Sequence, residues 1–419
     1  MLKLLVTADD FTGALDTGVQ FSKEGAKVLV TTNKHVSFEE IKEQFDVIVI
    51  DTETRHLSPE KSYNILKSIF AKTKKIDITN IYKKIDSALR GNISSEIRAL
   101  TDVFDKTIIS MVPAYPEINR TVDEGILYIE DKMVSQSVFS KDPYEPVLES
   151  NISKILEKSQ LKSNIRNPDQ DPIEGCINIY NTKIEKELSI ISDNLFFRDE
   201  TSKIVIGCAG FAKNYEKKLF LEEVIEDLNL YSTNSLLVMS GSVNKVTKDQ
   251  ILFAEKKGNY RLSLTDKQLL NSNYWKTDIG KKEVELFLNI LKKNSAIVMF
   301  DTFSNETIEK ISNYKILNNL SEEEIRTKIG QSLGQLTKIL LSNGIDRTIL
   351  FTGGDTLYQV MTILKIDSLI PISEISQGVV HSQIIFEDKI VNVLTKSGGF
   401  GSKELLIDLN NIVEQKGVK

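Results

Sequence analysis

Charged side chains cluster where an apolar, strand-forming stretch around Ile81 ends. Lys83, Lys84, Asp86 and Arg90 stand at the end of this stretch or just beyond it. Such cations bind anions, and an arginine can hold a carboxylate through two parallel hydrogen bonds. If the stretch is a strand of an open α/β sheet, these side chains lie at its carboxyl edge, where such sheets bind ligands. The alternative is a surface loop whose charges serve solubility.

A pair of carboxylates follows the first apolar stretch of the chain. Asp9 and Asp10 come after Leu2–Thr7 and before a helical pattern over Thr12–Lys23. At a turn from strand to helix, one carboxylate can cap the helix while the other points into a crevice. A carboxylate in a crevice can orient a hydroxyl group or act as a general base. The alternative is a plain helix cap with no further role.

Two more strand ends carry polar residues. Arg55 follows the continuous apolar stretch Asp46–Asp51, so we expect it at the same edge as the aspartates and the lysines. Arg120 and Thr121 follow the next predicted strand, Thr107–Val112, and either approach this edge or only form a turn. Polar residues at three strand ends indicate a site for a small, polar, anionic molecule.

The second half of the sequence contains three turns of small residues. Ser240–Ser242 follows the predicted strand Leu236–Ser240, Gly353–Thr356 follows Thr348–Phe351, and Lys396–Gly401 lies near the end of the chain. Such turns before helices present backbone N–H groups to phosphates, which favours a nucleotide site. There is no GxxxxGK[ST] motif, so this is not a P-loop protein. No GxGxxG motif follows a strand, which disfavours a dinucleotide enzyme.

Composition excludes several classes of protein. The 419 residues carry 53 Lys and Arg against 59 Asp and Glu, so no basic surface for nucleic acid is expected. Two cysteines exclude a disulfide framework and fit a reducing compartment, and three scattered histidines make a zinc site improbable. No apolar stretch approaches the ~20 residues that a membrane span needs. We therefore expect a cytoplasmic protein with no nucleic-acid or membrane partner.

Strand and helix signals alternate in both halves, which predicts the α/β class with mostly parallel sheets flanked by helices. The polar segment Tyr231–Ser235 predicts a boundary between domains over residues 1–231 and 235–419. Residues 113–180 read as a loop-rich excursion with a helix around Val147–Lys158.

Local signals mark particular boundaries. Ser58 and Pro59 open one helix, Ser321 and Glu324 form the capping box of another, and Glu387–Lys389 reads as the turn of a β-hairpin.

As an ordered set, the motifs resemble the four-carbon acid sugar kinases. The segments that carry the resemblance are Ala8–Ala14, Lys84–Asn92, Pro113–Pro116 with Arg120–Val122, Ser240–Ser242, Gly353–Thr356 and Lys396–Gly401. They span nearly the whole chain, from residue 4 to about residue 405.

The resemblance implies an N-terminal substrate domain and a C-terminal nucleotide domain, with ligand sites at the carboxyl ends of strands and in the interdomain cleft. It implies transfer of phosphate from ATP, with Mg²⁺, to the terminal (4-) hydroxyl of a four-carbon sugar acid such as threonate, erythronate or 3-oxo-tetronate. The expected substrate-binding residues are Asp9, Asp10, Arg55, Lys83, Lys84, Ile85, Asp86 and Arg90. The expected nucleotide-binding residues are Ser242, Gly353, Gly354, Asp355, Thr356 and Gly399. We expect Arg55, Lys84 and Arg90 to hold the substrate carboxylate.

The sequence leaves several choices open. Either Asp10 or Asp86 is the catalytic base, and we favour Asp10 because a carboxylate at a helix N-terminus stays ionised. Ile85 and Ala88 stand where the family usually has threonine, Asn119 where it commonly has glycine and Thr352 where it has serine, so the particular sugar acid is not fixed. A non-catalytic sensor of sugar acids or nucleotides is the alternative function. The Mg²⁺ ligands are not indicated, and a homodimer is one option for the oligomeric state.

Overall fold

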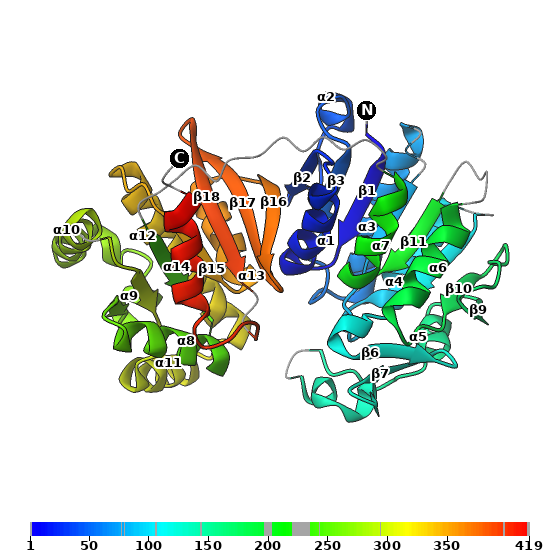
Figure 1. Cartoon of the computed structure of the whole chain (residues 1–419). Coiled ribbons are helices and arrows are strands. Elements are labelled where there is room, and N and C mark those ends of the chain that lie inside the picture. Colours follow the sequence, from blue (N-terminus) through cyan, green and yellow to red (C-terminus); the bar gives the residue numbers. More distant parts are fainter. Residues whose placement is uncertain are drawn as a thin grey trace. The chain divides into compact units, whose positions relative to one another are not determined.

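The computed structural model describes residues 2–76, 78, 80–104, 107–142, 145–196, 203–219, 235–242, 244–293, 295–396 and 399–416 (Figure 1). The chain divides into two compact units, Met1–Glu226 and Asp227–Lys419. Residues 231–234 of the predicted boundary segment lie outside the described residues. Each unit is an α/β structure around a mostly parallel sheet, so the predicted fold class is confirmed.

The first unit is built on a parallel sheet with the strand order β2-β3-β1-β4-β11-β5-β10-β9. Its strands are β1 (Leu4–Ala8), β2 (Val28–Thr31), β3 (Val47–Asp51), β4 (Asn80–Lys84), β5 (Ile109–Val112), β9 (Ser163–Arg166), β10 (Ile177–Tyr180) and β11 (Lys203–Gly207). Every residue of β1 and β3 is buried, as expected for apolar strands covered on both faces.

Helices cover both faces of this sheet. They are α1 (Phe11–Lys23), α2 (Phe38–Ile41), α3 (Pro59–Lys75), α4 (Ile93–Val103), α5 (Ile152–Glu157), α6 (Glu185–Phe196) and α7 (Ala209–Leu219). Side chains alternate along β4, so Ile81 joins the core under α3 and α4, whereas Tyr82 packs against aromatic rings of α1 and α7. This alternation also decides which lysine of β4 faces which helix layer.

An insertion between β5 and α5 forms a separate three-stranded antiparallel sheet. Its strands are β6 (Arg120–Asp123), β7 (Ile126–Ile129) and β8 (Lys132–Met133). Three short 3₁₀ helices accompany it, η1 (Pro116–Ile118), η2 (Val134–Gln136) and η3 (Val138–Lys141). The sequence predicted a loop-rich excursion here, and the predicted helix around Val147–Lys158 is observed only as the shorter α5.

The second unit has the strand order β13-β14-β12-β15-β18-β17-β16. Its strands are β12 (Leu236–Ser240), β13 (Tyr260–Ser263), β14 (Val298–Asp301), β15 (Thr348–Thr352), β16 (Ser368–Ser376), β17 (Val379–Phe386) and β18 (Lys389–Lys396). Its helices are α8 (Lys245–Lys256), α9 (Asp266–Leu270), η4 (Tyr274–Lys276), α10 (Asp278–Lys293), α11 (Asn305–Leu317), α12 (Glu322–Ser342), α13 (Gly354–Leu364) and α14 (Leu405–Lys416). Neighbouring strands from β13 to β18 in this order pair in parallel. The remaining strands, β17 and β16, continue from β18 as an antiparallel meander.

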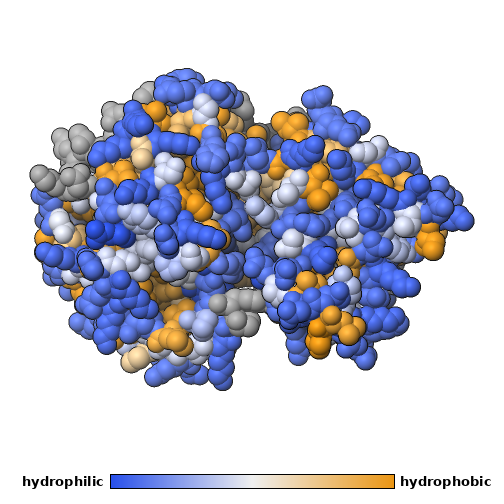
Figure 2. All heavy atoms as spheres, turned by 180° about the vertical axis from the view of Figure 1, so that it is seen from behind, coloured by the Kyte–Doolittle hydropathy of each residue, from blue (hydrophilic) through white to orange (hydrophobic). Residues whose placement is uncertain are grey.

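Predicted local signals are observed at three places. The hydroxyl group of Ser58 caps α3, with Pro59 in its first turn, and Ser321 and Glu324 form a capping box on α12. Glu387 and Asp388 both have positive φ in the hairpin turn between β17 and β18. On the face of the molecule shown in Figure 2, hydrophilic residues predominate. Within the described ranges, no helix is long and apolar enough to cross a membrane.

Candidate functional site

Three neighbouring strands of the first unit bring the predicted substrate residues together. Strand β1 lies between β3 and β4, and Ala8 at its end pairs with Asp51 on one side and Lys84 on the other. The loops that follow these strands therefore start side by side at the carboxyl edge of the sheet. The backbone N–H groups of Thr54 and Arg55 donate to the carbonyl of Asp9, which ties two of these loops to each other.

Asp10 is fixed by a helix and by an arginine. It is the N-cap of α1, and its Oδ1 accepts a hydrogen bond from the backbone N–H of Gly13 at 3.1 Å. The guanidinium group of Arg55 reaches both carboxylate oxygens, with Nη1 2.8 Å from Oδ2 and Nη2 2.8 Å from Oδ1. With its side chain 25% exposed, Asp10 is more accessible than Asp9 at 4% or Asp86 at 9%.

Arg55 connects all three aspartates. Its Nε donates to Asp9 Oδ2 at 2.7 Å, and its Nη2 lies 3.8 Å from Asp86 Oδ1. Asp86 is itself held by Arg90 in a fork, with hydrogen bonds of 3.0 Å from Nε and 2.9 Å from Nη2. The backbone N–H groups of Ala88 and Arg90 also donate to Asp86. The result is a chain of buried ion pairs beneath the more accessible carboxylate of Asp10.

The arginines keep these buried carboxylates ionised. Burial opposes ionisation of Asp86, but the charges of Arg90 and Arg55 outweigh it and hold its pKa well below the usual range. Burial likewise opposes ionisation of Asp9, and Arg55 with the two lysines of β4 lowers its pKa overall. Burial disfavours the charged form of Arg55, yet the three aspartates raise its pKa well above its ordinary value.

The neighbouring residues of β4 have different roles because their side chains alternate. Lys83 is buried on the α4 side, where its Nζ lies 2.7 Å from Glu96 Oε2 and donates to the carbonyl of Lys84 at 2.8 Å. The side chain of Ile85 belongs to the hydrophobic core on this same side. Lys84 points to the α1 side, toward Gly13 and Asp10.

The ammonium group of Lys84 lies close to Asp10. A Cβ atom added at Gly13 would be 2.5 Å from Lys84 Nζ and 2.5 Å from Asp10 Oδ1, so the glycine makes room for both groups. Lys84 is only 5% exposed, yet within the described ranges its Nζ forms no ion pair or hydrogen bond. Its charge is one of those that lower the pKa of Asp9.

Arg120 joins the same edge from β6. Its Nη1 donates to the Ser87 hydroxyl group, and its guanidinium group lies 5.1 Å from the centre of the Phe139 ring. Arg90 lies 5.3 Å from the centre of that ring. The sequence pointed to Arg120 only as one of two readings of a loop after a strand, because nothing local shows that β6 turns back toward the sheet edge.

The predicted nucleotide residues lie at the carboxyl ends of β12, β15 and β18, which are neighbours in the second sheet. The hydroxyl groups of Ser240 and Thr352 lie 2.8 Å apart, and the N–H of Gly353 donates to the carbonyl of Lys396 at 2.9 Å. Ser242 follows β12, and its Oγ accepts a hydrogen bond from the N–H of Asn244 at 3.2 Å. Ser397 and Gly398 of the third turn lie outside the described residues.

Helix α13 begins at this edge. Gly353, with φ of 92°, is its N-cap, and Gly354, Asp355 and Thr356 form its first turn. The N-terminus of the helix presents unpaired N–H groups and a partial positive charge, which suits phosphate. Asp355 Oδ2 forms an ion pair with Arg326 at 3.0 Å. Gly399 lies beside open space, with Asn244 Nδ2 3.8 Å from the position of an added Cβ.

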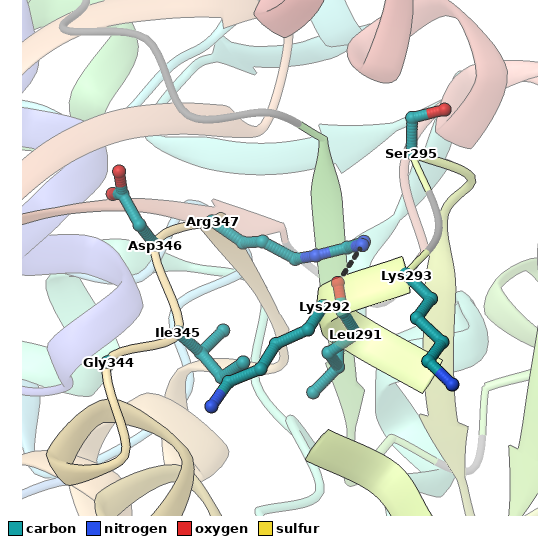
Figure 3. Close-up of a pocket in the computed structure, with 8 residues that line it drawn as sticks. All are labelled: Leu291, Lys292, Lys293, Ser295, Gly344, Ile345, Asp346 and Arg347. Carbon is teal, nitrogen blue, oxygen red and sulfur yellow. Dashed lines mark hydrogen bonds between the residues drawn. The ribbon is translucent and has the colours of Figure 1, made fainter. Parts of the chain in front are cut away.

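A pocket of about 500 Å³ lies at the other end of the second sheet (Figure 3). Its lining comes from residues 291–293, 295 and 344–347, which precede β14 and β15, so it is at the amino edge of the sheet. Arg347 reaches across it to the carbonyls of Leu291 and Ala296, at 2.8 and 2.9 Å. These bonds satisfy the end of α10 and indicate a structural role, remote from the glycine-rich turns.

No group of three or more His, Cys, Asp or Glu side chains that could hold a metal ion occurs in the part of the chain that the structure describes. Mg²⁺ usually keeps several waters and binds through one or two carboxylates together with substrate phosphates. The carboxylate of Asp355, in the first turn of α13, fits that pattern of ligation.

Comparison with protein families matches both units. Residues 4–212 match the model of a sugar-binding N-terminal domain, and residues 237–406 match that of a nucleotide-binding C-terminal domain.

Relatives with assigned activities align with almost the whole chain. The D-threonate kinase of Salmonella typhimurium is 26% identical over 440 aligned residues, covering 99% of each chain. The 3-oxo-tetronate kinase of Pseudomonas savastanoi is 22% identical and covers 95% of this chain and 94% of its own. A solved structure from Salmonella typhimurium LT2 has a TM-score of 0.79 at 21% identity, covering 98% of this chain and 100% of that one, which supports the fold.

Proposed function

Because this chain belongs to the four-carbon acid sugar kinase family, we propose that it transfers the γ-phosphate of ATP to the terminal (4-) hydroxyl of a four-carbon sugar acid. The candidate acids are threonate, erythronate and 3-oxo-tetronate, in keeping with the relatives' activities. The observation that carries the proposal is the ion pairing of the partly exposed Asp10 with the buried Arg55, which also lies beside Asp86, at the carboxyl edge of a domain that matches a sugar-binding model.

In this proposal Asp10 accepts the proton of the attacking hydroxyl group. It is the most accessible of the three clustered aspartates, and the cap of α1 and Arg55 fix its orientation. Asp86 is a weaker candidate for the base, because the fork of Arg90 and two backbone N–H groups already occupy its oxygens. Asp86 and Asp9 would instead hold Arg55 and Arg90 in position, as Lys83 and Glu96 would hold the loop after β3.

The nucleotide would bind in the second unit, with its phosphates at the N-terminus of α13. Gly353, Gly354, Asp355, Thr356, Ser242 and Gly399 are the proposed contacts. Mg²⁺ would come with ATP and neutralise charge on its phosphates, and Asp355 is the protein carboxylate that we propose as its neighbour. Transfer to a hydroxyl depends mainly on alignment and on stabilisation of charge, which these groups supply. ATP use fits a cytoplasmic location, which we retain as part of the proposal.

The test is ADP release by the purified protein with ATP and Mg²⁺, over a panel of four-carbon sugar acids and their stereoisomers. Release that depends on one acid supports the kinase and identifies its substrate. Binding of an acid and of ATP, measured by calorimetry, without release of ADP would instead support the sensor. Absence of both binding and turnover for every acid would contradict the proposed substrate class.

A further inference from the structure

Two cations of the substrate cluster lack the carboxylate partners that their neighbours have. Arg55 and Arg90 each hold an aspartate through a fork of two hydrogen bonds. Lys84 and Arg120 have no carboxylate within 4.0 Å among the described residues. Lys84 and Arg120 are therefore the cations of this cluster whose charge no close carboxylate balances among the described residues.

Arg120 is held in position without being neutralised. Ser87 accepts one hydrogen bond from it, and the ring of Phe139 lies beneath its guanidinium plane. Burial lowers the pKa of Arg120, and the negative charge of Asp86 opposes this effect only in part. Arg120 is only partly buried, so an anionic ligand can reach it, and its planar guanidinium group matches a carboxylate.

Lys84 and Arg120 lie around one position on the sheet edge. Arg120 donates a hydrogen bond to Ser87, which follows Lys84 by three residues, and the charges of both cations oppose the rise that burial causes in the pKa of Cys208. Cys208 follows β11, which lies next to β4, and its thiol donates to the carbonyl of Ala114 at 3.2 Å. Helix α7 begins at Ala209, so its positive N-terminal end lies at the same position.

We propose that Arg120, together with Lys84, binds the carboxylate group of the sugar acid and makes the enzyme selective for acids over neutral sugars. This inference rests on the proposed function and adds the residue that recognises the acid group. A neutral four-carbon polyol would leave the buried Lys84 and the partly buried Arg120 without an anion, so we expect it to bind more weakly than the acid. Asp10 is then left for the hydroxyl group that receives phosphate.

The test compares the wild-type protein, Arg120→Ala, Arg120→Lys and Lys84→Met. The ligands are the best four-carbon acid and the matching polyol without a carboxylate. Calorimetry measures acid binding directly, and steady-state kinetics give KM for the acid and for ATP. The matched control is Arg98→Ala, which removes an arginine that pairs with Asp102 on the surface of α4. Thermal unfolding establishes that each variant is folded.

Loss of a charge-assisted hydrogen bond costs ~1.5–3 kcal/mol, so we expect Arg120→Ala to weaken acid binding by roughly tenfold to hundredfold. Polyol turnover and KM for ATP should stay near wild type, and Arg120→Lys should restore part of the acid affinity. Equal losses for acid and polyol would show a merely structural role and overturn the inference, as would a rise in KM for ATP alone. If Arg120→Ala does not fold, Lys84→Met and Arg120→Lys decide by the same acid-to-polyol ratio.

The proposed kinase reaction can be contradicted without contradicting this inference. Acid binding that depends on Arg120 but gives no ADP would retain this inference and contradict the proposed reaction. If the protein forms ADP with an acid and neither Arg120→Ala nor Lys84→Met changes this activity, the proposed reaction is supported and this inference is contradicted.

Discussion

Arg55 holds Asp10 through two parallel hydrogen bonds of 2.8 Å, one to each carboxylate oxygen. The arginine is almost completely buried, whereas the aspartate is partly open to solvent. Arg55 thus fixes the orientation of the Asp10 carboxylate, which remains partly accessible to solvent. The same guanidinium group pairs with Asp9, so a change at Arg55 should affect both stability and substrate binding.

The first prediction concerns Arg55. Breaking a buried ion pair by removing one partner costs ~3–5 kcal/mol, so Arg55→Ala should lower the melting temperature markedly. Arg55→Lys keeps a charge but loses the fork, and in this folded variant KM for the sugar acid should rise roughly tenfold to hundredfold. Thermal unfolding and steady-state kinetics measure the two effects. A rise in KM for ATP with an unchanged KM for the acid would contradict the assignment of ligands to domains.

The sequence was sufficient to predict this edge of the sheet. The apolar stretches before Asp9, Arg55 and Lys84 are long enough to identify as buried strands, and a parallel sheet brings strand ends to one edge. The orientations of two side chains needed the structure. Lys83 and Ile85 face α4 and the core, because alternation along β4 separates them from Lys84. We retain Lys83 and Ile85 as predicted substrate contacts only through their backbone atoms.

The insertion was the least predictable part of the first unit. Strands β6, β7 and β8 are two to four residues long, so they lack a clear apolar period. Arg120 was therefore recognised only as a residue after a strand. Its position beside Ser87 comes from pairing between segments far apart in the sequence.

The second prediction concerns Gly13. Its replacement by alanine favours the helix intrinsically, but the new Cβ would meet both Asp10 Oδ1 and Lys84 Nζ at 2.5 Å. The flexible lysine must move, so Gly13→Ala should raise KM for the sugar acid by about tenfold, the loss expected when one charge-assisted contact is weakened. Thermal unfolding of the variant measures any separate effect on the stability of α1. A KM for the acid equal to that of the wild type would show that Lys84 does not contact the substrate.

The third prediction concerns the pH dependence of stability at Asp51, the last residue of β3. Burial, together with the charges of Glu53 and Asp10, raises the pKa of Asp51 well above 3.8, and its Oδ2 has no hydrogen-bond partner among the residues that the structure describes. Since the folded pKa exceeds the unfolded one, this group's contribution to stability is fully present below the unfolded pKa. It is lost as pH rises through the folded pKa.

Asp51→Asn removes this titration. The melting temperature at pH 7 should therefore rise, with no gain at pH 4 and below. Thermal unfolding across this range measures the difference, with the exposed Asp169→Asn as control. A gain that is the same at every pH would indicate that ionisation of Asp51 is not its cause.

The fourth prediction concerns Gly399 in the second unit. An added side chain would enter open space beside Asn244, so Gly399→Val should fold normally. If phosphates approach the backbone there, the valine would block them, and nucleotide affinity should fall by tenfold or more, or ~1.4 kcal/mol. Titration of a non-hydrolysable ATP analogue into the folded variant measures this, with Ser402→Val as a neighbouring control. Unchanged affinity would show that this turn only connects β18 to α14.

The last prediction separates the two candidate bases. Asp10→Asn keeps an N-cap for α1, because asparagine caps helices as well as aspartate, but it removes the proton acceptor. We expect kcat to fall by ~10²-fold or more, within the range for loss of a general base, with little change in ATP affinity. Asp86→Asn leaves Arg90 without its fork and should act mainly through stability and KM for the acid. A larger loss of kcat in Asp86→Asn would reverse the assignment, and wild-type kcat in both variants would mean that alignment and Mg²⁺ suffice without a side-chain base.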